Sequence, residues 1–329
     1  MDRKQALLTW VQKTLDDPEC YVKSASSDAS FRSYWRVFSQ LQTYVVMDAP
    51  VEHENCLPFI DISKRLDDSG VQVPKVFAND LEQGFLLLSD LGTIQYLSVL
   101  NKDNYLSLYE DAIQALHTIQ QQTSNENLPS YDKALLKQEL QLFDKWFIEQ
   151  HLGISLNSEQ LDIISCCQKL LIKNALQQPQ TFVHRDYHSR NLMKTTKNNP
   201  GILDFQDAVI GPVTYDLVSL LKDCYISWDE KAIDQLSDLF RKDYNRLNDL
   251  SIEAEQWQKW FDLMGVQRHL KAIGIFCRLN YRDHKSGYLK DINRTLCYVK
   301  QACGKYPELQ QFLNVIHEIT PSMDFICEQ

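Results

Sequence analysis

The chain has 329 residues, which is enough for two domains with hydrophobic cores of their own. Hydrophobic residues make up 44% of it and charged residues 24%, as in an ordinary soluble globular protein. The net charge of −10 and the absence of a Lys/Arg cluster exclude a typical nucleic-acid binder. The chain has no apolar run of bilayer length, no secretory signal pattern, and nine scattered cysteines without zinc-ligand spacing. We therefore expect a cytoplasmic protein in a reducing compartment, with no membrane partner.

The first ninety residues have the pattern of a small antiparallel sheet with one packed helix. A short amphipathic helix is predicted over 3–15, since Leu7, Leu8 and Val11 share one side of it. Strand-forming residues then gather in five segments, 20–23, 31–38, 44–47, 73–77 and 85–88. The packed helix is predicted over 52–66.

The pattern becomes helical after Gly92. Two sets of apolar residues recur at helical spacing, Leu106, Tyr109, Ile113 and Leu116, and then Leu136, Leu140, Phe143 and Phe147. Short strands interrupt around 182–207, and helices resume at Tyr215. The order of elements predicts an α+β, bilobal, protein-kinase-like fold. Residues 1–88 would form an antiparallel-sheet N-lobe, 89–92 a hinge, and 93–329 a mostly helical C-lobe, with the nucleotide between the lobes.

The most informative segment runs from Phe182 to Asp207. An apolar strand leads into a polar loop that contains Asp186 and, five residues later, Asn191; a second apolar strand then ends at Asp204. This spacing is typical of magnesium-dependent phosphoryl transfer. The alternative is a structural polar loop with Asx turns.

Each of these three side chains has a predicted role. Asp186 would be the catalytic base that accepts the proton of the attacking hydroxyl. Asn191 and Asp204 would hold Mg²⁺ on the phosphates of ATP, because this hard cation prefers oxygen ligands. Without its neighbours, Asn191 could equally be a turn former.

A polar segment at 24–30 joins the first two predicted strands. Its small side chains would let the backbone approach a phosphate, and its N–H groups and hydroxyls could donate to it. It contains no glycine, so a plain hairpin turn is the alternative. The predicted nucleotide contacts here are Ser26, Ser27, Asp28, Ala29, Ser30 and Arg32.

The connector after the 85–88 strand is predicted to contact adenine. Its candidate residues are Ser89, Asp90 and Leu91, ahead of Gly92. A simple turn is the alternative. Elsewhere, acceptor contacts are predicted at His188, Arg190, Asp207, Arg268 and His269, and structural roles are predicted for His184 and Asp216. Asp216 stands in a first helical turn, where an acidic group suits the helix dipole. The alternative for Arg268 and His269 is a solvated helix face.

The run from His184 to Asn191, followed by Asp204, resembles the aminoglycoside phosphotransferase and choline kinase superfamily, relatives of the protein kinases. Bacterial anomeric amino-sugar kinases are similar over a longer stretch, including 27–32, 46–50, 204–225 and 267–270. The resemblance implies ATP and Mg²⁺. It also implies the C1 hydroxyl of N-acetylmuramate or N-acetylglucosamine as acceptor, in cell-wall recycling. The oligomeric state stays open.

One departure from the kinase pattern is clear. The third strand carries Met47 where kinases have a phosphate-binding lysine. Arg32, Arg36 and Lys23 are the candidate substitutes. An aminoglycoside or other hydroxyl kinase, and an inert nucleotide-binding pseudokinase, are the alternative functions.

Overall fold

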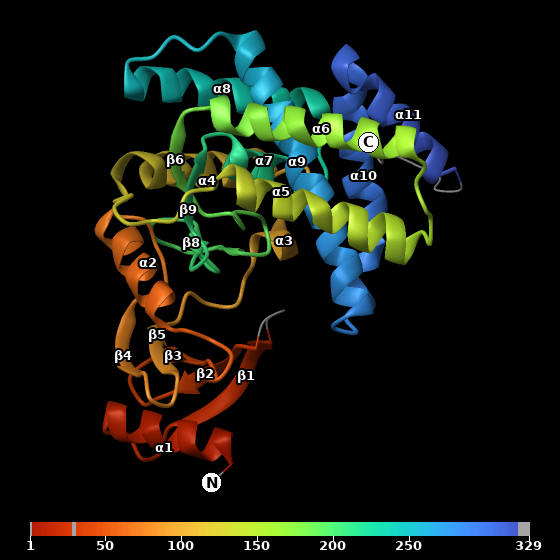
Figure 1. Ribbon diagram of the computed structural model, residues 1–329. Coiled ribbons are helices and arrows are strands. Elements are labelled where there is room, and N and C mark those ends of the chain that lie inside the picture. Colours follow the sequence, from red (N-terminus) through yellow and green to blue (C-terminus); the bar gives the residue numbers. More distant parts are fainter. Residues whose placement is uncertain (1, 28–30, 322–329) are drawn as a thin grey trace. The chain divides into compact units, whose positions relative to one another are not determined.

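The structure is a computed structural model that describes residues 2–27 and 31–321. The chain forms two compact units (Figure 1). We call them the sheet unit, Met1–Val99, Gln121–Ser124 and Arg190–Asp207, and the helical unit, Leu100–Gln120, Asn125–Ser189 and Ala208–Gln329. The sheet unit contains a five-stranded antiparallel sheet and the helical unit is mostly helix, so the predicted α+β class is confirmed.

The sheet has the strand order β1-β2-β3-β5-β4, and every neighbouring pair is antiparallel. Its strands are β1 (Tyr21–Ser27), β2 (Ser33–Phe38), β3 (Thr43–Asp48), β4 (Val76–Asp80) and β5 (Phe85–Ser89). The five strands lie close to the five segments predicted from their β-branched and aromatic residues.

Several boundaries differ from the prediction. Residues 24–27 are part of β1 and not of a loop, because they pair with β2 up to Ser27 opposite Ser33. Strand pairing here overrides the weak strand propensity of a serine-rich run. β4 begins after Pro74, which has no N–H to donate to a ladder. Helix α2 (Leu57–Asp68) starts later than residue 52 and has a proline in its first turn.

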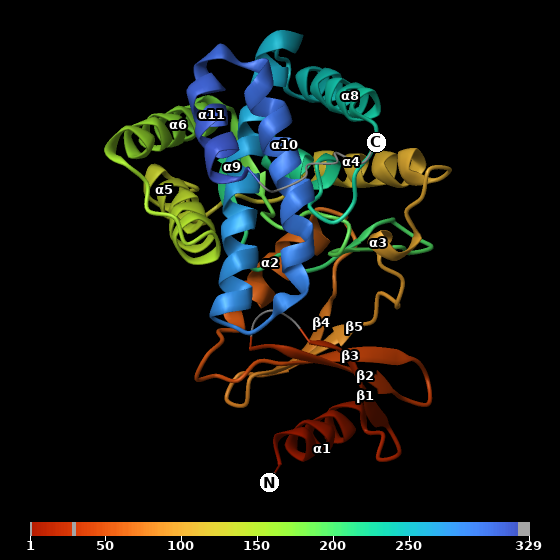
Figure 2. The ribbon, with the colours of Figure 1, turned by 90° about the vertical axis from the view of Figure 1, so that its right-hand side faces the viewer.

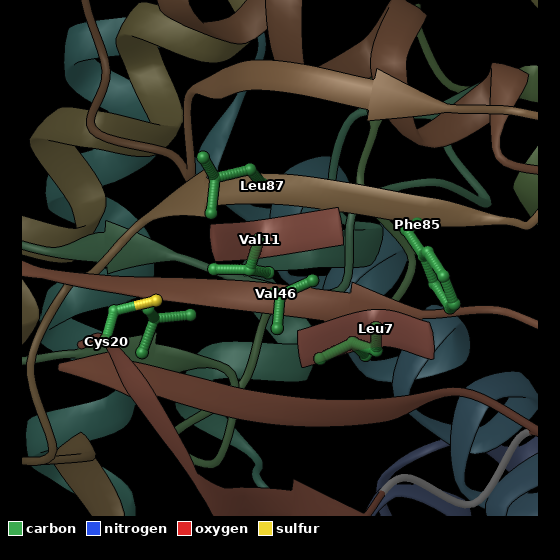
Figure 3. Packing of buried hydrophobic residues seen from close by; sticks show 7 residues of the cluster. Leu7, Val11, Cys20, Val46, Phe85 and Leu87 are labelled. Carbon is green, nitrogen blue, oxygen red and sulfur yellow. The ribbon is translucent and has the colours of Figure 1, made fainter. Parts of the chain in front are cut away.

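Helix α1 (Arg3–Leu15) covers one face of this sheet (Figure 3). Its Leu7 and Val11 are fully buried against Val46, Phe85 and Leu87. Complete burial of such a side chain stabilises the fold by about 1.5–3 kcal/mol relative to exposure. The apolar periodicity predicted for this helix is therefore the periodicity of its buried face.

The helical unit is organised around α9 (Ala254–Tyr281), which packs against α5, α6, α7, α8 and α10. Figure 2 shows α9 and α10 side by side. Every residue from Phe261 to Lys271 is buried, so this helix is enclosed all round rather than amphipathic. The charged residues in this part of α9 therefore lie in the interior of the helical unit, where they can line a buried site.

The other elements follow in chain order. The helices are α3 (Tyr96–Val99), α4 (Tyr105–Gln122), α5 (Lys133–Leu142), α6 (Ser158–Gln177), α7 (Tyr215–Leu221), α8 (Glu230–Asn248), α10 (Ile292–Lys305) and α11 (Gln310–Ile319). Shorter or irregular turns are the π-helix η1 (Phe143–His151) and the 3-10 helices η2 (Ser286–Asp291) and η3 (Pro307–Leu309). In α4 the predicted apolar face is wrong at Leu106, which is 47% exposed, and Leu108 is buried in its place.

Two small ladders frame the predicted catalytic segment, one in each unit. β6 (Gln180–Val183) pairs with β9 (Val209–Pro212) in the helical unit. β7 (Leu192–Met193) pairs with β8 (Gly201–Ile202) in the sheet unit. The short strands predicted around 182–207 are thus confirmed. In residues 2–27 and 31–321, no helix combines the length and the apolarity needed to cross a membrane.

Helix α9 passes close to the backbone of α5 at Gly274. A Cβ atom there would lie 2.4 Å from the carbonyl carbon of Leu142 and 2.5 Å from its oxygen, at the end of α5. Only glycine permits this approach. Gly304 in α10, by contrast, has open space around the same position.

We expect Gly274→Ala to lower the free energy of unfolding by about 1–3 kcal/mol, because the added methyl group forces α5 and α9 apart. Gly304→Ala is the matched control and should raise it by up to about 1 kcal/mol, as alanine favours a helix interior. Thermal unfolding of the two variants measures the difference. Equal transition temperatures would contradict the close packing at Gly274.

Candidate active site

The predicted catalytic residue Asp186 lies in the loop after β6, in the helical unit. The loop backbone is held by Asp216, whose carboxylate accepts the N–H of His184 at 2.6 Å and that of Arg185 at 3.0 Å. The Asp186 N–H donates to His184 Nδ1 at 3.2 Å. Burial raises the pKa of Asp216 to about 7, while the two N–H groups favour its carboxylate form. His184 and Asp216 therefore fix the backbone that leads into Asp186.

Asp186 lines a cavity of about 90 Å³ within the helical unit. The polar lining residues are Arg185, Asp186, His188, Arg268 and Lys271, and the aromatic ones are Tyr215, Tyr225 and Phe276. Pockets that enclose a whole small molecule usually measure about 300–1,000 Å³. This cavity therefore has room for part of a sugar-sized molecule.

The charge of Asp186 is set by its neighbours. Burial on its own would raise the pKa of this carboxyl group, but the positive charges of the neighbouring basic residues hold it below its ordinary value. The contributors are Lys271, His188, Arg185 and Arg268. Asp186 is therefore ionised at neutral pH and can accept a proton.

Two of these cations share one buried carboxylate, Glu139 of α5. Its Oε1 lies 3.1 Å from Lys271 Nζ and is also paired with the Arg185 guanidinium. Tyr131 donates its hydroxyl to the other oxygen. Burial would raise the pKa of Glu139, but Lys271 and Arg185 lower it. The ionised carboxylate therefore links α5, the loop that contains Asp186 and α9.

Helix α9 presents Arg268 and Lys271 to the cavity, three residues apart on one face. His269, between them, does not line it. Its Nε2 lies 2.8 Å from the Lys222 carbonyl oxygen, and its ring stacks on Tyr298. Burial lowers the pKa of His269 to about 3, so the ring is neutral. His188 does line the cavity and contacts the ring of Tyr225.

The two predicted metal ligands lie together in the sheet unit. Pairing of β7 with β8 sets their separation, and the Asn191 carbonyl oxygen accepts the N–H of Leu203 at 2.9 Å. The Asn191 Nδ2 atom is 3.4 Å from Asp204 Oδ2, and Gln206 Nε2 donates to Asp204 Oδ1 at 2.8 Å. Asp204 adopts φ +62°, a strained conformation of the kind found at functional sites.

Among the candidate substitutes, Arg32 is the one most similar to the phosphate-binding lysine of kinases. It forms a 2.9 Å ion pair with Glu54, and both side chains are nearly shielded from solvent. Burial would lower the pKa of Arg32, but Tyr34, Glu54 and Asp204 raise it. Met47 is fully buried and offers no charge. Arg32 therefore lies within electrostatic reach of the predicted metal ligand Asp204.

The predicted adenine connector is held by an ion-pair clamp. Asp90 binds Arg36 through two bonds of 2.7 and 3.1 Å and accepts the N–H of Gly92 at 2.9 Å. Arg36 also donates to the Gly92 carbonyl oxygen at 2.7 Å. The Ser89 hydroxyl accepts the N–H of Lys75 at 2.9 Å. The side chain of Arg36, a candidate substitute for the kinase lysine, is thus already bound to Asp90 and Gly92 at the connector.

The remaining predicted residues lie in the sheet unit. Leu91 is partly buried near Gly201, Arg190 is half-buried, and Asp207 is exposed. Ser26 and Ser27 close strand β1. Asp28, Ala29 and Ser30 lie outside the described residues.

Several cavity residues were not predicted from the sequence. Lys271 follows Arg268 at helical spacing, which was a usable signal once 254–281 was recognised as one helix. Phe276, eight residues after Arg268 on the same helix, carries the same signal. Glu139 does not line the cavity and carries no such signal, because it meets Arg185 only through tertiary packing.

Residues 22–250 match the profile of the phosphotransferase enzyme family. The chain belongs to this family. It is 44% identical to an N-acetylmuramate/N-acetylglucosamine kinase of Pseudomonas putida, over 96% of both chains. It is also 44% identical to a kinase of the same name from Pseudomonas aeruginosa, over 94% of both.

This phosphotransferase also resembles a solved choline kinase from Cryptosporidium parvum. The TM-score is 0.65 at 13% identity, with 95% of this chain and 98% of that chain covered. At such low identity the likeness shows the fold alone, and it confirms the predicted kinase-like architecture. With the family and the relatives, it also confirms the predicted superfamily. The protein is a kinase, and its chemistry is ATP-dependent phosphoryl transfer.

Asp90→Asn keeps an oxygen for the Gly92 N–H but removes the charge that pairs with Arg36. The two side chains are only 7% and 18% exposed, so we expect a loss of about 1–3 kcal/mol in the free energy of unfolding. Asp67→Asn is the control, since its Lys75 pair is 36% and 58% exposed and should contribute less than about 1 kcal/mol. Thermal unfolding compares them; equal losses would show that the clamp is no stronger than a surface pair.

Proposed function

We propose that this kinase transfers the γ-phosphoryl group of ATP to the anomeric C1 hydroxyl of N-acetylmuramate or N-acetylglucosamine. The proposed choice of acceptor rests on the 44% identity, over 96% of both chains, to a kinase named for these two sugars. The cavity beside Asp186 supports it, because its cationic lining suits a neutral or anionic sugar better than a polycationic aminoglycoside.

In the proposed mechanism Asp186 orients the C1 hydroxyl and accepts its proton late in the reaction. An anomeric hydroxyl is more acidic than an ordinary alcohol, so an aspartate of low pKa suffices as base. Asp216 acts indirectly, by fixing the backbone of His184 and Arg185. Alignment of the two substrates supplies most of the remaining rate enhancement.

Asn191 and Asp204 would hold Mg²⁺. Their side chains lie 3.4 Å apart and both offer oxygen, and the Asn191 amide can turn its oxygen toward a cation. The described residues contain no cluster of three or more metal-binding side chains. This fits a cation that completes its coordination with phosphate oxygens and water. Bound Mg²⁺ would neutralise the charge on the ATP phosphates.

Arg32 would replace the missing third-strand lysine as the phosphate-binding cation. Its pair with Glu54 parallels the lysine–glutamate pair of protein kinases. We further propose residues 1–88 as the N-lobe and 89–92 as the hinge, with Ser89, Asp90 and Leu91 offering backbone groups to adenine. Residues 93–329 would form the C-lobe.

An ADP-release assay over amino sugars and aminoglycosides, with and without Mg²⁺, tests the function. We expect turnover with N-acetylmuramate and N-acetylglucosamine only when Mg²⁺ is present, and a phosphorus NMR signal of a sugar 1-phosphate. Turnover with an aminoglycoside but with neither sugar would refute the proposed acceptor.

Asp186→Ala should lower kcat by about 10²–10⁴-fold, the usual contribution of a general base, and leave Mg²⁺–ATP binding measurable by calorimetry. Asp204→Ala should weaken Mg²⁺-dependent ATP binding as well. Asp243→Ala is the control and should change neither quantity, since the Asp243 side chain of α8 is 47% exposed and pairs with Arg246. An unchanged kcat in Asp186→Ala would remove this residue from the role of base.

Lys271→Met should move the acid limb of the kcat/KM profile to higher pH. Lys271 is the largest electrostatic contributor that lowers the pKa of Asp186, so its loss raises that pKa and the base becomes protonated at a higher pH. Lys259→Met is the control on the same helix, since Lys259 pairs with Glu308 instead. An acid limb that stays in place, in a folded variant, would rule out this electrostatic coupling.

A further inference from the structure

Arg268 is an unusual cation in this molecule. It is only 6% exposed, yet its guanidinium forms no ion pair with a carboxylate in the described part of the chain. Its one hydrogen-bonding partner among those residues is the sulfur of Cys224, at 3.6 Å, and its Nε is buried without an acceptor. A guanidinium has five N–H donors, and burying them unsatisfied is costly.

Two other cations of the cavity have a carboxylate partner. Arg185 and Lys271 share Glu139. The carboxylates that influence Arg268, those of Asp223 and Asp186, act on it only at longer range. Asp223 accepts instead from the N–H and hydroxyl of Ser189 and from the N–H of Tyr225.

Arg268 lines the same cavity as Asp186. A ligand group that enters beside the reacting hydroxyl can therefore reach the guanidinium. The fork of N–H donors matches a planar carboxylate, and such bidentate pairs are among the strongest hydrogen bonds in proteins. The aromatic rings of Tyr225 and Phe276 also line the cavity and offer an apolar surface to the rest of the group.

We propose that Arg268 is a specificity-determining residue that binds the carboxylate of an acidic acceptor sugar. This rests on the proposed function, in which one of the two acceptors, N-acetylmuramate, carries a lactyl carboxylate and the other, N-acetylglucosamine, does not. The cavity volume of about 90 Å³ suits a lactyl group together with the reacting hydroxyl, and it is smaller than a whole amino sugar requires. The neutral sugar leaves the guanidinium without its partner.

The test is the ratio of kcat/KM for N-acetylmuramate to kcat/KM for N-acetylglucosamine. Arg268→Met should lower this ratio about 30-fold or more, since removing one member of a buried charge pair has effects of this size. Arg268→Lys should lower it less, because it keeps the charge and loses the fork. Arg278→Met is the control on the same helix. Arg278 is partly buried and does not line the cavity, so the ratio should stay at the wild-type value.

A second measurement needs no variant. The primary amide of N-acetylmuramate keeps the shape of the lactyl group and removes its charge, so the wild-type kinase should use it much less well than the acid. Arg268→Met should not distinguish acid from amide. Equal use of acid and amide by the wild type would overturn the proposal, even if the variant fails to fold.

The remaining outcomes separate the two hypotheses. If the wild type phosphorylates both sugars and Arg268→Met leaves their ratio unchanged, the carboxylate role is wrong and the proposed function stands. If that variant instead raises the KM for ATP with the ratio unchanged, Arg268 binds the donor phosphates and the proposal fails. If the wild type phosphorylates neither sugar, the proposed function itself has failed.

Discussion

The buried carboxylate of Glu139 is the interaction on which the cavity of the helical unit depends. It joins Arg185 of the loop that contains Asp186, Lys271 of α9 and Tyr131 in one hydrogen-bonded group. A carboxylate this deeply buried is stable only while its partners remain, and removing one cation from such a group costs about 3–5 kcal/mol. The loop that contains Asp186 is thus fixed from two sides, by Glu139 through the Arg185 side chain and by Asp216 through the backbone.

This arrangement also explains how several cations and the ionised carboxylate of Asp186 can lie close together in the interior of the helical unit. Glu139 offsets the charges of Lys271 and Arg185, so both can stand near Asp186 within one interior. His269, which has no carboxylate to offset its charge among the residues described, is neutral instead. Arg268 is the exception, a buried charge without an ion-pair partner in the same part of the chain. Because a buried charge without a partner is costly, we infer that a ligand supplies the partner of Arg268.

The parts of the fold and site that could be predicted are those that depend on residues close together in the sequence. Strand propensity located the five strands of the sheet, and the spacing of Asp186, Asn191 and Asp204 was enough to predict a phosphotransferase, which the family match confirms. The predicted boundaries of strands were wrong where pairing with another strand sets the end of the element. Ser27, for example, is a strand residue because Ser33 pairs with it. Glu139 could not be found at all, since it lies 46 positions from Arg185 in the sequence and only tertiary packing brings the two together.

The sheet register supports the proposed replacement of the third-strand lysine by Arg32. Ser33 on β2 is opposite Asp48 on β3, so Arg32, one residue before Ser33, stands beside the end of the strand that carries Met47. Met47 faces the core and is fully buried, whereas Arg32 keeps an ion pair with Glu54 and lies within electrostatic range of Asp204. A positive charge one strand away can satisfy the same phosphate, because what the chemistry requires is a cation near the metal ligands and not a particular strand. The loss of the lysine therefore does not imply the loss of catalysis, and it weakens the case for an inert pseudokinase.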